Sequence, residues 1–182
     1  FKLSQSKLIL FVGLTTMSIT MGMVPAAKDI VSVLLGNQWN DSIPILKIIL
    51  FAVPFDFLSV TYGLSFDALG KLNQKIAIQF FALLILVIGF INFYQFGLAG
   101  IALALVLSHI IRFLTYMIFN QKILHISSQV LIRTVVMISI TSIFVFTSSY
   151  LAAYLSGYWG FSSWLALTFE ILICLIVYSL FL

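Results

Sequence analysis

Long uncharged stretches alternate with short polar segments along the whole chain. The first stretch, between Lys7 and Lys28, runs for twenty residues without a charge, and five similar stretches follow it. A helix of about 20 apolar residues crosses the hydrocarbon core of a bilayer. The stretches are too long and too uniformly apolar for the strands of a membrane barrel, which alternate over about ten residues. The pattern therefore predicts an all-α transmembrane protein.

Six membrane-spanning helices are expected, joined by short polar turns and forming a single helical membrane domain over residues 1–182. Pro25 and Pro54 lie inside the first two and are expected to bend them, because neighbouring helices can satisfy the carbonyl groups that proline leaves free. The predicted spans cover residues 8–35, 43–66, 76–94, 98–119, 131–154 and 161–182.

The composition agrees with a membrane protein, since 63% of the residues are hydrophobic and 8% are charged. A soluble domain carries about 25% charged residues. The net charge of +4 does not indicate nucleic-acid binding, because Lys and Arg collect in the cytoplasmic loops of membrane proteins. Lys2 and Lys7 precede the first span, and Lys71 and Lys75 lie between spans two and three. Lys122 lies between spans four and five, with Arg133 at the start of the fifth. The sequence thus predicts that these segments, and both chain ends, are cytoplasmic.

The two ends of the sequence suggest a C-terminal piece of a longer protein. The chain begins at Phe1 without a methionine and ends inside an apolar stretch at Leu182. No glycine-rich phosphate loop, HExxH or GxSxG motif occurs in it. The sequence therefore predicts no catalytic residues, no metal site and no cofactor, and the expected protein is not an enzyme.

Ionisable residues at membrane depth are the candidate site residues, because their burial is costly and they usually face a cavity or a partner. Ser108, His109 and Arg112 fall at helical spacing and are expected to share one polar face of the fourth span. A cation on that face suits an anionic group such as phosphate. Alternatively, Arg112 extends to the lipid head groups at the cytoplasmic side.

Three further candidates lie on other spans. Asp56, in the middle of the second span, is either an ion- or proton-coupling carboxylate or the partner of a cation from another helix. Lys28, at the end of the first span, lies either at the rim of a cavity or in an interfacial ion pair with Asp29. Glu170 lies near mid-depth in the last span, which is expected to be peripheral.

Four short motifs occur in a fixed order and together resemble one known family. They are IVSVLLGNQW, LKIILF, DALGK and GLAGIALAL. This ordered set resembles bacterial polysaccharide flippases of the MOP exporter superfamily. The shared features are an apolar helix end closed by Gly and then Trp, a cytoplasmic turn with Gly70-Lys71, and a helix that starts with Gly97, Gly100 and Ala102. The resemblance covers about residues 24–122, and the last two spans add only compatible hydropathy.

The resemblance implies that the six spans form part of the second lobe of a MOP-type (MATE-like) transporter in the bacterial cytoplasmic (inner) membrane. Such a protein flips a lipid-linked oligosaccharide across the bilayer by alternating access, for polysaccharide biosynthesis. Its partners would be the bilayer, the lipid-linked saccharide and the missing N-terminal lobe, without which this segment is not expected to transport. One alternative is a membrane-embedded enzyme of the same pathway, such as a polymerase or an acyltransferase. The others are a multidrug exporter of the same superfamily and a structural membrane subunit.

Overall fold

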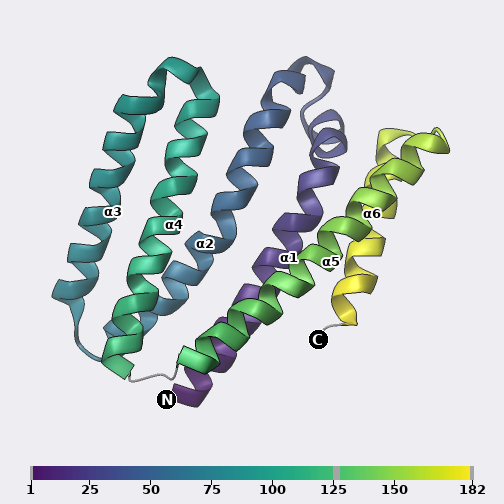
Figure 1. The fold of residues 1–182 in the computed structure, drawn as a ribbon. Helices are drawn as coiled ribbons and strands as arrows, with labels where there is room; N and C mark the ends of the chain where they lie inside the picture. Colours follow the sequence, from purple (N-terminus) through teal and green to yellow (C-terminus); the bar gives the residue numbers. More distant parts are fainter. Residues whose placement is uncertain (1, 125–127, 181–182) are drawn as a thin grey trace.

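The described part of the protein is a bundle of six long α-helices with two short 3₁₀ turns (Figure 1). A computed structural model describes residues 2–124 and 128–180. The helices are α1 (Lys2–Leu34), α2 (Ile43–Ala68), α3 (Leu72–Phe93), α4 (Gly97–Leu124), α5 (Ser128–Tyr158) and α6 (Ser163–Ser179), and the 3₁₀ turns are η1 (Asn37–Ser42) and η2 (Tyr94–Phe96). The described residues contain no β-strand, which confirms the expected all-α class.

Successive helices run in opposite directions along the bundle (Figure 1). The connections α1–α2 and α3–α4 lie at the upper end in that view, and α5 and α6 join on the same side. The start of α1 and the connection between α2 and α3 lie at the lower end. The start of α1 and the α2–α3 connection, both predicted to be cytoplasmic, therefore lie at one end of the bundle. This arrangement is compatible with the predicted orientation, which itself stays a prediction.

Among the described residues, four helical stretches are long and apolar enough to cross a membrane. They are Gln5–Leu34, Asn37–Ala68, Leu72–Ile123 and Arg133–Tyr158. The third stretch has 52 residues and contains both α3 and α4, which fold back on each other at η2. The helix Ser163–Ser179 is apolar but shorter. The protein is thus a multi-pass helical membrane protein by length and composition, and the count of six spans stays a prediction.

Most helices extend beyond the spans that hydropathy predicts. The predicted fourth and fifth spans leave residues 120–130 between them as a polar connection, but α4 continues to Leu124 and α5 begins at Ser128. That expectation is wrong because hydropathy detects the lipid-buried part of a helix, whereas backbone hydrogen bonding continues into the polar head-group region. Pro25 and Pro54 do not end their helices, and bends at them stay a prediction. The predicted end of the last span, residues 181–182, lies outside the described residues.

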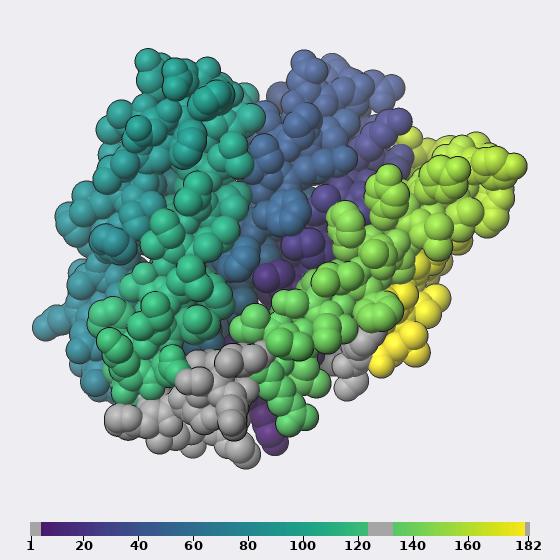
Figure 2. All heavy atoms as spheres, viewed as in Figure 1, coloured from purple at the N-terminus to yellow at the C-terminus, as the bar shows by residue number. Residues whose placement is uncertain are grey.

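Two helices organise the packing. α4 lies between α2 and α3, and α1 packs against α2, α5 and α6. The space-filling view in Figure 2 shows one face that is hollowed between α4 and α5, with α1 lying deeper between them. A buried hydrophobic cluster joins α1, α2, α3 and α4, and in it Phe66 and Tyr116 meet edge to face with ring centres 5.4 Å apart.

The α3–α4 hairpin depends on glycine at two points. Gly97 has a φ of 64°, a left-handed conformation that favours glycine, directly after η2. Gly100 lies against the end of α3, so that a Cβ at this position would overlap the carbonyl oxygen of Phe93 and lie 3.0 Å from its carbonyl carbon. The two helices can therefore turn back on each other within three residues.

Candidate functional site

Three ionisable side chains meet between α2 and α4, and we call them the charged cluster: Asp56, His109 and Arg112. The Arg112 guanidinium donates through Nη2 to Asp56 Oδ1. The same nitrogen lies 2.9 Å from His109 Nδ1, which itself lies 3.3 Å from Asp56 Oδ1. An unprotonated Nδ1 accepts from Arg112, whereas a protonated Nδ1 donates to Asp56, so the histidine tautomer decides which contact is a hydrogen bond.

The local sequence explains why these residues meet. Phe113, next to Arg112, packs its ring 5.6 Å from Phe55, next to Asp56, and 5.9 Å from Tyr62, measured between ring centres. This aromatic contact fixes the register of α4 against α2. Asp56 and Arg112 each lie twelve residues before the end of their helix, or about 18 Å along the axis, so they occupy the same depth.

The charged cluster is partly open. The exposed fraction of the side chain is 43% for Asp56, 23% for Arg112 and 22% for His109. The Nε atom of Arg112 is buried and has no acceptor among the described residues. The guanidinium therefore keeps a donor for a second acceptor while Asp56 holds its Nη2.

A small cavity of about 100 Å³ adjoins Arg112 between α2, α3 and α4. Its polar lining residues are Ser59, Lys75, Gln79, Arg112 and Tyr116. The ammonium group of Lys75 lies 2.6 and 2.8 Å from the two carboxylate oxygens of Asp67. Two cations thus line one cavity, and each is held by a carboxylate from α2.

The predicted polar face of α4 is divided between two neighbours. Ser108 is buried and donates to the carbonyl oxygen of Ala82 on α3, at 2.8 Å, so it lies outside the charged cluster. His109 and Arg112 turn toward α2. The expectation of one shared face fails for Ser108 because α4 packs between two helices. Ser108 contacts α3, whereas His109 and Arg112 contact α2.

The other candidates have separate surroundings. Lys28 is exposed on α1 and shares none of the contacts of the charged cluster. Glu170 is buried where α6 faces α1. For Asp56, the structure agrees with the alternative of a cation partner from another helix, and a role in coupling stays a prediction. For Arg112, the guanidinium turns to Asp56, and contact with the lipid head groups stays an alternative.

A second polar group joins three helices, and the sequence did not single it out. We call it the polar clasp: Gln5, Ser65 and Asn120, all buried. Gln5 Nε2 donates to Ser65 Oγ and lies 3.4 Å from Asn120 Oδ1, while Asn120 Nδ2 donates to the carbonyl oxygen of Tyr62 at 3.0 Å. An amide side chain at the end of an apolar helix was the only signal, and Asn120 was assigned to a loop.

Comparisons with known proteins add no assignment. Neither a protein-family model, nor a curated protein, nor a solved structure matches the chain. The function must therefore be argued from the charged cluster, the cavity beside it and the order of the sequence motifs.

Proposed function

We propose that this chain is one lobe of a transporter that flips a lipid-linked oligosaccharide across the bacterial cytoplasmic membrane by alternating access. The ordered motifs that resemble polysaccharide flippases support this proposal. The up-and-down hairpins are also compatible with six membrane spans. The turn glycines Gly70 and Gly97, which belong to those motifs, both have a positive φ.

The observation that carries the proposal is the partial exposure of the charged cluster. Asp56 and Arg112 lie about 18 Å from the ends of their helices, and 43% of the Asp56 side chain is exposed. Ionised groups at such depth rarely face lipid, and they generally line a water-filled cavity or contact another part of the protein. A transport path between this lobe and a second lobe would provide that environment.

The proposed ligand of this face is the pyrophosphate of the lipid carrier. Arg112 and Lys75 line one cavity, and guanidinium and ammonium groups are the usual phosphate-binding side chains. A pyrophosphate offers more charge and more acceptor oxygens than one carboxylate, so it would compete with Asp56 for the guanidinium. The buried and unpaired Nε of Arg112 would gain an acceptor when the guanidinium leaves Asp56 for the pyrophosphate.

The test uses the full-length protein in cells, with surface polysaccharide and protein abundance measured together. Arg112→Ala should abolish surface polysaccharide and leave abundance intact, while Arg112→Lys should recover part of the activity, because a point charge replaces a two-pronged donor. Arg133→Ala removes an exposed arginine from α5 and serves as the matched control with normal export.

A charge exchange separates substrate binding from helix packing. If the ion pair only holds α2 to α4, Arg112→Ala lowers abundance, and the double exchange Asp56→Arg with Arg112→Asp restores both abundance and export. If Arg112 binds pyrophosphate, the exchanged protein is present but does not export. Normal export by Arg112→Ala contradicts the proposal.

One observation favours a second candidate, the multidrug exporter. Asp56 is the most exposed member of the charged cluster, so a cationic substrate could reach its carboxylate. In that case Asp56→Asn should abolish efflux of cationic compounds. Neither Asp56→Asn nor Arg112→Ala should change the amount of surface polysaccharide.

A further inference from the structure

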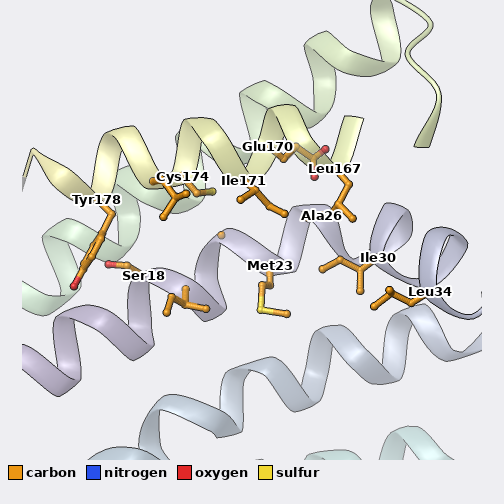
Figure 3. Close-up of a pocket in the computed structure, with 13 residues that line it drawn as sticks. Ser18, Met23, Ala26, Ile30, Leu34, Leu167, Glu170, Ile171, Cys174 and Tyr178 are labelled. Atoms are coloured by element: carbon orange, nitrogen blue, oxygen red, sulfur yellow. The ribbon is translucent and has the colours of Figure 1, made fainter. Parts of the chain in front are cut away.

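A second cavity lies between α1 and α6, on the other side of the bundle from α3. Its volume is about 370 Å³ and its lining is almost entirely apolar. Figure 3 shows Met23, Ala26 and Ile30 of α1 facing Leu167, Ile171 and Cys174 of α6 across it. We call this cavity the α1–α6 groove. It lies on helices separate from the charged cluster, so an inference about it is independent of the proposed function.

The α1–α6 groove contains a buried carboxyl group. Glu170 has an exposed fraction of 1%, and among the described residues neither of its carboxylate oxygens has a hydrogen-bond partner. No cation of the described chain lies within ion-pair distance of it, and Asp29 of α1 is close enough to add a second negative charge. Burying a carboxyl group without a partner is costly, so the groove favours a ligand that brings a donor or a positive charge.

A second unpartnered polar group lies farther along the groove. The hydroxyl of Ser18 is buried and also has no partner among the described residues. Ser18 is eight residues before Ala26, which lies beside Glu170 in Figure 3, so the two polar groups are separated by about 12 Å along α1. The groove therefore fits an elongated apolar body with a polar group at Glu170 and room for another near Ser18.

The depth of Glu170 separates two sources of a cation. Glu170 lies seven residues after the start of α6, about 10 Å along its axis, whereas the hydrocarbon core is about 30 Å thick. The ammonium group of a phospholipid stays in the head-group region, so it would not reach this carboxylate. An amine whose nitrogen is flanked by apolar groups can dissolve at that depth and pair with Glu170.

We propose that the α1–α6 groove binds a hydrophobic amine, with the nitrogen paired to the Glu170 carboxylate and the apolar body along α1 and α6. Gly22 is part of the groove wall, and a Cβ there would lie 2.8 Å from the Cys174 sulfur. The absence of a side chain at Gly22 therefore allows α1 and α6 to approach closely at this point of the groove.

The test compares two photoreactive probes in nanodiscs that contain the full-length protein. One is N-benzylhexylamine with a diazirine on its alkyl chain, and the other is the matching benzyl hexyl ether, which has the same shape but no positive charge. Labelled peptides are identified by mass spectrometry. The amine should label α1 and α6 at least about tenfold more than the ether, since a hydrogen bond to a charged group contributes about 1.5–3 kcal/mol.

Two variants decide whether Glu170 is the cause. Glu170→Gln keeps the shape of the side chain and should reduce the preference for the amine to near one. Leu172→Gln places the same amide on an exposed face of α6 and should leave the preference unchanged. Equal labelling by both probes in the wild-type protein overturns the proposal, as does an undiminished preference in Glu170→Gln.

Discussion

The substitution Gly100→Ala should loosen the α3–α4 hairpin. A Cβ at Gly100 would overlap the backbone carbonyl oxygen of Phe93 and lie 3.0 Å from both the Phe93 carbonyl carbon and the Phe96 Cβ. The obstructing oxygen belongs to the backbone at the end of α3, so no side-chain rotation can make room. The start of α4 must move away from α3.

The expected magnitude is a balance of two effects. Overpacking a tight site typically costs about 1–3 kcal/mol, and replacing glycine by alanine inside a helix contributes about 0.5–1 kcal/mol of stability. The net loss for Gly100→Ala should therefore lie between about 0 and 2.5 kcal/mol, in the upper part of that range because the obstruction is backbone. At roughly 2–4 °C for each kcal/mol in a chain of this size, the unfolding temperature should fall by several degrees.

The same substitution at Gly157 is the matched control. Gly157 lies in the last turn of α5 and is exposed, and a Cβ at this position would have no described atom within 4 Å beyond its own helix turn. Gly157→Ala should therefore be neutral or stabilise by about 0.5 kcal/mol. Thermal unfolding of both purified variants in one detergent, followed by tryptophan fluorescence, measures the change in unfolding temperature. It should be negative for Gly100→Ala and zero or positive for Gly157→Ala.

The relative unfolding temperatures of these two variants decide whether the contact at Gly100 is tight. An unfolding temperature for Gly100→Ala equal to or above that of Gly157→Ala would show that α4 can shift from α3 at no cost. The close approach at Gly100 would then not hold the hairpin.

Two more predictions concern the polar clasp and the orientation. Asn120→Ala removes the bond to the Tyr62 carbonyl and should destabilise by about 0.6–1.7 kcal/mol, the range for hydrogen bonds between membrane helices; equilibrium unfolding in mixed micelles measures it, and an unchanged midpoint contradicts it. In a Cys174→Ala background, an impermeant thiol reagent added outside intact cells should label Trp39→Cys and spare Leu72→Cys. Labelling of Leu72→Cys but not of Trp39→Cys would show that the orientation is the opposite of the predicted one.

The helical class was predictable because the bilayer imposes a simple requirement on each segment. A backbone in hydrocarbon must satisfy its own hydrogen bonds, so an apolar stretch of span length can only be a helix. Helix ends were less predictable, because polar residues such as Gln121 and Lys122 continue α4 beyond the apolar part. Hydropathy contains no information on where backbone hydrogen bonding stops in the head-group region.

The charged cluster was only half predictable. Helical spacing placed His109 and Arg112 together, because both lie on α4 and one rotation per 3.6 residues fixes their relation. The contact with Asp56 depends on α4 packing against α2 at matching depth, which no local pattern encodes. The separation of Ser108 from the charged cluster also depends on helix packing, because α3 packs against the side of α4 that carries Ser108.

The central place of α1 has a consequence for biosynthesis. Gly22 accepts a hydrogen bond from Ser149, 127 residues later, and Thr15 meets Tyr178, 163 residues later. At about 5–20 residues per second, the ribosome needs roughly 6–25 s to reach Ser149 after Gly22. During that interval one side of α1 must be covered by lipid or by the insertion machinery, with its neighbours α5 and α6 not yet made. Completion of α5 and α6 is therefore the step that covers this side of α1, and a chain stalled before that step would leave this side of α1 exposed to degradation.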